Sequence, residues 1–559
     1  MYVLSLPPDF LWATYSGLAA LIFLPSIFFV RSIPGSDIES ASGWPRIAAE
    51  FLGYAVVAMM VWSTVAYLTD PGYLDHIEPT IAGVSWWYSH GHKLYPAWND
   101  GEGLYGLIYG PLVYQATAFA LSFRPSILMS KLPGVACCWL GAVTVAVALR
   151  PLISSVRQTV LPMSVCLIVA GTFENTAYWN RPDPYLFLCA ALALFAVLRF
   201  RPATAAVAIG ILGGLSINLK LHGGFYILPC AMALFVPWVS FANAARIAAI
   251  VALSGLPTLV VPFLDPNVSF TQYVAYLRSA SRHGMDLTSL LTNLGFASVL
   301  LMPVLILAWA NRERDTKTAW PVALAYVTSI LTVAIIAAKA GSGMPHLLPF
   351  LPAFAFTLVT AAKALHGPGC RRDAIASNQT RFAIPFLLML LVYMPAFTTN
   401  LRALRGPDFE RISAAESREV AELYAEYPDA VAGVAGDDTY KMTFFRVIGV
   451  LAGGRPDFDV PAWQDLLQSG APASLPEQLV IDCQTSTWII PRGERPFTRL
   501  SYYPGHPPLF TDRFRELFRQ NYKLVKETAN YTVYACQARQ AGLTVRGSSA
   551  TVTASPTSH

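Results

Sequence analysis

Charged side chains are scarce in this sequence. Of its 559 residues, 13% are charged and 54% are hydrophobic, whereas soluble proteins carry about 25% charged residues. Water would solvate such a surface poorly, but lipid would accept it. The net charge of +5 is small and spread along the chain, so we expect no nucleic-acid partner. The composition therefore predicts an integral membrane protein.

The start of the chain lacks the features of a signal peptide. Residues 1–10 contain no Lys or Arg, and no A-x-A site follows the first apolar run. A secretory signal needs both a basic segment and such a cleavage site. We therefore expect the first apolar run to be retained as a membrane span.

Cysteine is also uncommon, with eight residues in the whole chain. Five lie in apolar runs, where a cysteine behaves as a small hydrophobic residue. Cys483 and Cys536 lie instead in the polar C-terminal stretch. They could form a disulfide in an oxidising compartment, but the sequence leaves this open because it does not fix their distance.

Long apolar runs dominate the first 400 residues. A spanning helix needs about 20 such residues, and shorter ones are tolerated inside a bundle. We expect about 12 spans, near residues 10–30, 47–68, 132–149, 158–173, 184–198, 203–217, 224–241, 247–263, 288–310, 319–338, 346–362 and 381–398.

Residues 104–123 are apolar enough to span, and the distribution of positive charge decides their placement. If they do not cross, the short inner loops hold 12 Lys and Arg residues and the outer loops hold 5. Inner loops are normally the richer in positive charge. We therefore expect helices lying along the outer surface at 104–123, and residues 399–559 outside.

The C-terminal stretch has the composition of a soluble α/β domain. Residues 412–427 and 514–518 have helical patterns, and residues 430–435, 478–481 and 532–536 resemble strands. The sequence thus predicts a membrane domain over 1–398 with outer-face loop helices at about 70–131. A soluble domain follows over 399–546, and a disordered tail over 547–559.

Titratable residues gather in the predicted outer loops, and the richest stretch is 70–96. Glu78 precedes Pro79, which suits the first turn of a helix, and Gly91 would end that helix. The helix dipole favours an ionised carboxylate at this position, so Glu78 could act as a general base.

The other outer loops bring cations and a second carboxylate to the same face. Asp183 stands between two prolines where a span begins, although it could simply cap that helix. His346 follows a glycine-rich turn, although it could equally be an interfacial histidine bonded to the backbone. The basic and histidine candidates for holding a phosphate are Lys220, His222, Arg278, Arg282, Lys339 and His346.

Five motifs follow one another in a recognisable order. They are the acidic stretch after an early span, a G-x-x-x-Y-P end to its helix at Gly91–Pro96, Y-G-P-L-x-Y at Tyr109–Tyr114, R-P-D-P at Arg181–Pro184, and K-x-G-x-G-x-x-H-L-L-P at Lys339–Pro349. This order resembles the GT-C class of integral-membrane glycosyltransferases. It is similar to the branch of bacterial protein O-mannosyltransferases and the aminoarabinose transferase of lipid A.

The resemblance implies a sugar donor on a polyprenyl phosphate at the outer face of a bacterial inner membrane. It implies transfer with inversion to a hydroxyl of a lipid, a polysaccharide or a protein. Glu78 matches the family's catalytic acid best and Asp75 second, because this chain has D-H-I-E where many members have adjacent acids. Asp183 matches the second acidic position. Asp75, His76 and Glu78 would be the ligands if the protein used a divalent metal; no other cofactor is expected.

A transporter or flippase of lipid-linked sugars is the main alternative. Transporters tend to place charges at the bilayer midplane and to contain two repeated halves, whereas here the charges gather on one face and no repeat is evident. A scaffold that binds partners through its outer domain is a second alternative. Substitution of Glu78 by Gln separates both from a transferase.

Overall fold

The computed structural model describes most of the chain: residues 43–73, 75–97, 103–105, 109–172, 178–235, 240–310, 320–364, 375–403, 414–433, 441–454, 457–481, 483–493, 495–501, 503 and 505–537. Contacts divide the chain into two compact units. The helical unit comprises 1–70, 108–277 and 283–411, and the mixed unit comprises 71–107, 278–282 and 412–559. The mixed unit is therefore assembled from three separate stretches of sequence.

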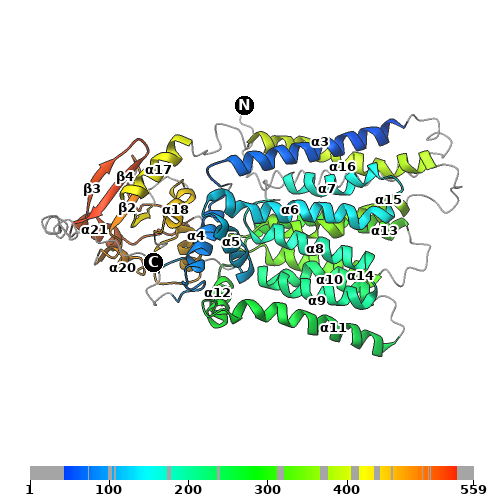
Figure 1. Cartoon of the computed structure of the whole chain (residues 1–559), viewed down its shortest axis with the longest axis horizontal. Coiled ribbons are helices and arrows are strands. Elements are labelled where there is room, and N and C mark those ends of the chain that lie inside the picture. The colour runs from blue at the N-terminus through cyan, green and yellow to red at the C-terminus, as the bar shows by residue number, and fades with distance from the viewer. Residues whose placement is uncertain are drawn as a thin grey trace, which may run out of the picture. The chain divides into compact units, whose positions relative to one another are not determined.

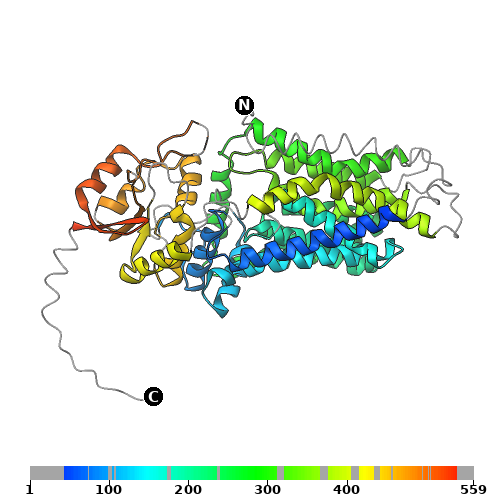
Figure 2. The same cartoon turned by 90° about the horizontal axis from the view of Figure 1, so that it is seen from above.

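The helical unit is a bundle whose helices lie side by side in both views (Figures 1 and 2). Its helices are α3 (Trp44–Thr69), α5 (Pro111–Phe123), α6 (Ile127–Leu149), α7 (Val160–Thr172), α8 (Pro182–Arg199), α9 (Pro202–Leu219), α10 (Gly224–Phe235), α11 (Phe241–Val260), α13 (Leu287–Ala310), α14 (Trp320–Ile336), α15 (Leu351–Ala364) and α16 (Ile375–Ala403). Short 3₁₀ turns include η3 (Leu221–Gly223), η4 (Val261–Leu264) and η5 (Met344–Phe350), and α12 (Phe270–Ala280) leads from this unit to residues 278–282.

The predicted spans agree closely with these helices. Eight helices in the described part of the chain are long and apolar enough to cross a membrane. Three further predicted spans coincide with the shorter helices α7, α10 and α14. The span predicted at 10–30 lies outside the described residues.

Close packing of small residues holds α11 to the bundle. A side chain at Gly210 or Gly214 of α9 would place a Cβ 2.0 or 2.1 Å from the hydroxyl oxygens of Ser254 and Thr258 on α11. Small residues four apart let two membrane helices approach closely. The rest of α11 is largely exposed, as expected for a peripheral helix that faces lipid.

The mixed unit contains a four-stranded sheet in the order β1-β2-β4-β3. Its strands are β1 (Ala430–Ala432), β2 (Thr487–Pro491), β3 (Tyr522–Glu527) and β4 (Tyr531–Cys536). Strand β1 pairs with β2 in parallel, and the other two pairs are antiparallel. Its helices are α4 (Glu78–Ser89), α17 (Ala414–Glu426), α18 (Lys441–Leu451), α19 (Val460–Gln468), α20 (Glu477–Ile481) and α21 (Asp512–Asn521).

Two features stabilise this unit. An aromatic cluster centred on Phe497 contacts Trp488, Phe510, Phe514 and Phe518 at ring distances of 4.8–5.1 Å. Cys483 and Cys536 form a disulfide with a Cα–Cα distance of 5.9 Å. The sequence had left this pairing open.

Two of the predicted elements are wrong, one of them only in part. Residues 104–123 were expected to be helical, but helix α5 begins at Pro111, and Leu104 forms a β-bridge with Phe458. Gly110 is extended, with φ of −67° and ψ of 161°, and proline suits the first helical position that follows it. Residues 478–481 were expected to form a strand but belong to α20. A short apolar run does not separate the two structures, and Glu477 after Pro476 is a helix start.

The remaining predictions for the C-terminal stretch hold where they can be compared. Helices α17 and α21 and strands β1 and β4 lie where they were predicted. The predicted disordered tail at 547–559 lies outside the described residues. The predicted fold class, a polytopic helical membrane protein with a C-terminal α/β domain, is confirmed.

Candidate functional site

In the turn that leads into α4, Asp75 and Glu78 exchange hydrogen bonds in the pattern of a capping box, which we call the capping box although the N-cap of α4 itself is Ile77. The Asp75 carboxylate accepts hydrogen bonds from the backbone N–H groups of Ile77 at 2.5 Å and Glu78 at 3.1 Å. The Glu78 carboxylate accepts one in return from the N–H of Asp75 at 3.3 Å. Each carboxylate thus satisfies a backbone donor of the other residue. Glu78 is fully buried, and Asp75 is partly exposed.

The helix starts and ends where the sequence predicted. Pro79 occupies its first turn, and Glu78 is the acidic residue there. Helix α4 ends at Ser89, and Gly91 follows with φ of +89°. Glycine adopts this left-handed conformation without strain, which is why it commonly follows a helix. The backbone around Glu78 is therefore determined locally by Pro79 and the capping box.

In the helical unit, Asp183 and Lys220 form a buried ion pair. Asp183 lies in the first turn of α8, and Lys220 directly follows α9. The Lys220 ammonium donates a hydrogen bond to the Asp183 carboxylate at 2.7 Å, and both side chains are at most 5% exposed. The ammonium also lies 5.6 Å from the centre of the Tyr109 ring. Two residues predicted for different roles are therefore direct partners.

Two predicted phosphate-binding histidines lie together beside Tyr226. The rings of His222 and His346 stack at a centroid distance of 5.3 Å. The Tyr226 hydroxyl donates to the carbonyl of His346 at 2.6 Å and lies 3.1 Å from Nε2 of His222. Because the hydroxyl has one proton, and it goes to the carbonyl, Nε2 of His222 must be the donor in the second bond. Tyr226 thereby joins η3 to η5.

The remaining predicted cations fall into two groups. Lys339 is half-buried in the helical unit and pairs with Met285 in a β-bridge. Arg278 and Arg282 belong to the mixed unit, and both are exposed. Arg282 donates to the carbonyl of Ser469 in the same unit at 3.4 Å.

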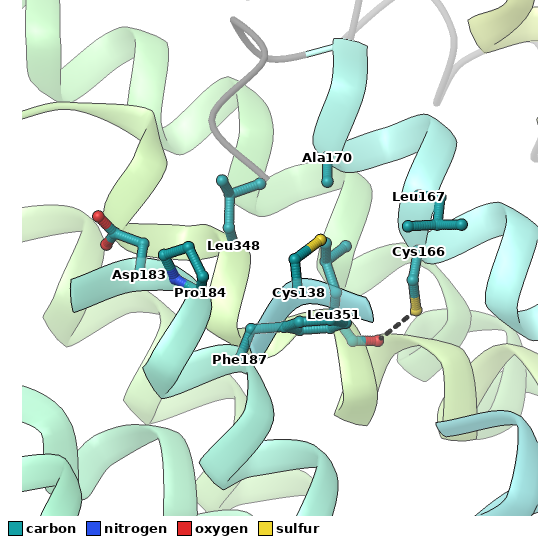
Figure 3. Close-up of a pocket in the computed structure, with 9 residues that line it drawn as sticks. All are labelled: Cys138, Cys166, Leu167, Ala170, Asp183, Pro184, Phe187, Leu348 and Leu351. Atoms are coloured by element: carbon teal, nitrogen blue, oxygen red, sulfur yellow. Dashed lines mark hydrogen bonds between the residues drawn. The ribbon is translucent and has the colours of Figure 1, made fainter. Parts of the chain in front are cut away.

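A small pocket lies beside Asp183 (Figure 3). Its lining is apolar except for that residue and the thiols of Cys138 and Cys166. The Asp183 carboxylate points away from the sulfur atoms, and the Cys166 thiol donates to the carbonyl of Leu351. The cavity volume of about 10 Å³ is close to what one water molecule requires. The pocket is therefore too small for a sugar.

A buried lysine in the helical unit and a buried ion pair in the mixed unit were not predicted from the sequence. Lys131 of α6 is fully buried and donates to the carbonyls of Tyr67 at 2.8 Å and Asp70 at 2.9 Å, at the end of α3. A lysine inside an apolar run is a recognisable signal for this residue. In the mixed unit, Arg446 and Asp459 form a buried ion pair. Their pairing has no local sequence signal.

The predicted metal ligands Asp75, His76 and Glu78 do not fit a metal site. Across the residues that the structure describes, no three His, Cys, Asp or Glu side chains gather in a way that could hold a metal ion. The two carboxylates instead bind backbone N–H groups of the capping box.

Comparisons with known proteins identify the fold. No protein-family profile and no curated protein matches the chain. Among solved structures, it is similar to a crystal structure of ArnT from Cupriavidus metallidurans bound to undecaprenyl phosphate. The TM-score is 0.53 and the identity 14%, over 89% of this chain and 98% of that one. The apo structure of the same protein gives a TM-score of 0.51 and 13% identity over 86% and 97%. The chain therefore has the ArnT fold, which confirms the predicted resemblance at the level of fold.

Proposed function

We propose that this protein is a membrane glycosyltransferase. It moves a sugar from a polyprenyl-phosphate donor to a hydroxyl acceptor at the outer membrane face, with inversion at the anomeric carbon. The observation that carries the proposal is the shared fold, over 89% of the chain, with a protein crystallised with undecaprenyl phosphate. The order of motifs around Glu78, Asp183 and His346 supports it independently.

Glu78 is the proposed general base, and Asp75 is the second candidate. As the acceptor oxygen bonds to the anomeric carbon, the bond from that carbon to the phosphate oxygen breaks, and the acceptor proton passes to the carboxylate. Assistance of this kind contributes roughly 10²–10⁴-fold. The helix dipole at the start of α4 favours the ionised carboxylate that this role requires.

The cations serve the departing polyprenyl phosphate in this proposal. Negative charge grows on the phosphate as the bond breaks, so donors aimed at it stabilise the transition state. The candidates are Lys220, His222, Arg278, Arg282, Lys339 and His346. Asp183 holds Lys220 at 2.7 Å, which supports an orienting role for Asp183 and fixes the direction of one ammonium.

The proposed orientation places the C-terminal domain outside the cytoplasm of a bacterial inner membrane. The disulfide between Cys483 and Cys536 supports it, because disulfides persist in oxidising compartments. The excess of Lys and Arg in the opposite loops supports it as well.

The test is a transfer assay on purified protein in lipid. A panel of polyprenyl-phosphate sugars is supplied with a crude acceptor extract, and release of free polyprenyl phosphate is measured. We expect release from one donor. Glu78→Gln should abolish it, because glutamine keeps the capping box but cannot accept the proton. Asp75→Asn is the matched control, since asparagine also caps helices well.

Each result has a distinct meaning. Loss in Glu78→Gln with activity in Asp75→Asn would support Glu78 as the base, and the reverse would support Asp75. If neither substitution lowered release, both base assignments would be wrong. If folded wild-type protein released nothing from any donor, the flippase alternative would take precedence.

A further inference from the structure

Helix α4, which carries the proposed base, packs against the C-terminal part of the mixed unit. It contacts α18, which lies about 360 residues later in the sequence. A Cβ at Gly83 of α4 would meet the side chain of Val450 on α18 at 3.9 Å, an ordinary van der Waals distance. Residues Glu78 through Ser85 of α4 are all buried. The N-terminal two thirds of the helix are thus buried, and α18 is one of the elements that it packs against.

A buried polar contact fixes the start of this helix. Arg446 of α18 donates a hydrogen bond to the hydroxyl of Thr80, two residues after Glu78. Another nitrogen of the same guanidinium lies 2.6 Å from a carboxylate oxygen of Asp459. Exposure of the three side chains is 8% or less. The planar guanidinium can bind two partners in fixed directions. The position of Asp459 therefore helps to determine the position of Thr80.

Asp459 also holds the other end of the segment 71–107. Its backbone N–H donates to the carbonyl of Leu104, and the N–H of Leu104 donates to the carbonyl of Asp457, each at 2.9 Å. Gly103 makes this approach possible, because it has φ of +108° and a Cβ there would lie 2.9 Å from the Asp457 carbonyl oxygen. Asp459 is therefore linked to helix α4 through Arg446 and contacts the later end of the segment 71–107 directly at Leu104.

We propose that Arg446 and Asp459 are positioning residues that orient α4, and with it Glu78, for proton transfer. The C-terminal domain is then part of the catalytic apparatus and not an accessory cover. This inference rests on the proposed function, because it assigns Arg446 a role through the proposed base. Arg446 acts through Thr80 and does not itself contact the reacting atoms.

The test compares variants of Thr80 and Arg446 in the transfer assay on the full chain. Thr80→Val removes the acceptor of the Arg446 hydrogen bond at nearly constant volume, and Thr80→Ser restores a hydroxyl. We expect Thr80→Val and Arg446→Met to lower kcat by about 10- to 100-fold, with the KM for the donor within about twofold. Thr80→Ser should recover most of kcat, and the double variant should lose no more than Arg446→Met alone.

Arg492→Met is the matched control. Arg492 pairs with Glu527 at 3.7 Å, but both side chains are 49% exposed, so kcat should stay unchanged. Amide hydrogen exchange over residues 78–85 gives a second readout and should become faster in Arg446→Met. An intact disulfide between Cys483 and Cys536 in each purified variant would show that the domain has folded.

The inference and the proposed function fail differently. If Glu78→Gln is inactive while folded Thr80→Val and Arg446→Met keep wild-type kcat, the positioning role is wrong and the base stands. If Glu78→Gln keeps full activity, the base assignment is wrong whatever Arg446 does. Loss of kcat in Thr80→Val that Thr80→Ser fails to recover would also overturn the positioning role.

Discussion

Two carboxylates at helix starts, one in each unit, differ in what they bind. Asp183 opens α8 in the helical unit and pairs with the ammonium of Lys220 at 2.7 Å. Glu78 opens α4 in the mixed unit and accepts a hydrogen bond from the backbone N–H of Asp75 at 3.3 Å. The partner of Asp183 is therefore a cation, whereas the partner of Glu78 is a neutral backbone donor. This difference agrees with the proposed roles, orientation for Asp183 and proton transfer for Glu78.

The largest expected effect is on catalysis. Glu78→Gln should lower kcat for transfer by roughly 10²–10⁴-fold without lowering the unfolding temperature, because the capping box survives. Asp183→Asn should lower kcat less, since its proposed role is to orient Lys220. Steady-state transfer kinetics beside thermal unfolding would check this. Equal losses from the two substitutions, with both proteins folded, would remove the distinction between the carboxylates.

Removing one charge of the buried pair Asp183–Lys220 should strongly lower the stability of the helical unit. Asp183→Asn or Lys220→Met alone leaves a buried charge without its partner, which should lower the free energy of unfolding by about 3–5 kcal/mol. The double variant Asp183→Asn, Lys220→Met should recover a large part of that loss. Unfolding in detergent measures all three proteins. Additive losses in the double variant would mean that the two residues are not coupled.

Loss of the disulfide should affect the stability of the two units differently. The mixed unit contains the disulfide between Cys483 and Cys536, whereas Cys137, Cys138, Cys166, Cys189 and Cys230 of the helical unit are free thiols. Replacing Cys483 and Cys536 by serine should destabilise the mixed unit by about 2–4 kcal/mol. Hydrogen exchange resolved by segment would measure it. Equal loss of protection in both units would contradict this expectation.

A smaller effect concerns pH. Burial raises the pKa of Asp459 above its ordinary value, even though Arg446 lies beside it. The folded state then binds the proton more tightly than the unfolded state does. The free energy of unfolding should therefore rise as the pH falls from the raised pKa toward the ordinary value of about 3.9, and should fall again as the pH increases.

The size of that pH effect is about 1.4 kcal/mol for each unit by which the pKa is raised. Denaturant unfolding of the mixed unit at several pH values would measure it, with Asp459→Asn as the control that lacks the titrating group. An identical pH dependence in wild type and Asp459→Asn would assign the effect to another residue.

Sequence patterns succeeded where the controlling interactions are local. The apolar runs identified eleven helices of the bundle, since burial in lipid depends on length and composition alone. The acidic residue, proline and glycine around α4 likewise gave its start and end. Patterns failed at residues 478–481, where three apolar residues were too few to separate a strand from the helix α20.

The sequence by itself determined that this chain is a polytopic membrane protein, and which carboxylates and cations could perform chemistry. The tertiary structure decided which of them become partners. Lys220 meets Asp183 across 37 residues, and Arg446 meets Thr80 across 366. Such contacts form because buried charges and donors need partners wherever the fold supplies them. No local pattern records that choice, because it depends on how distant helices pack.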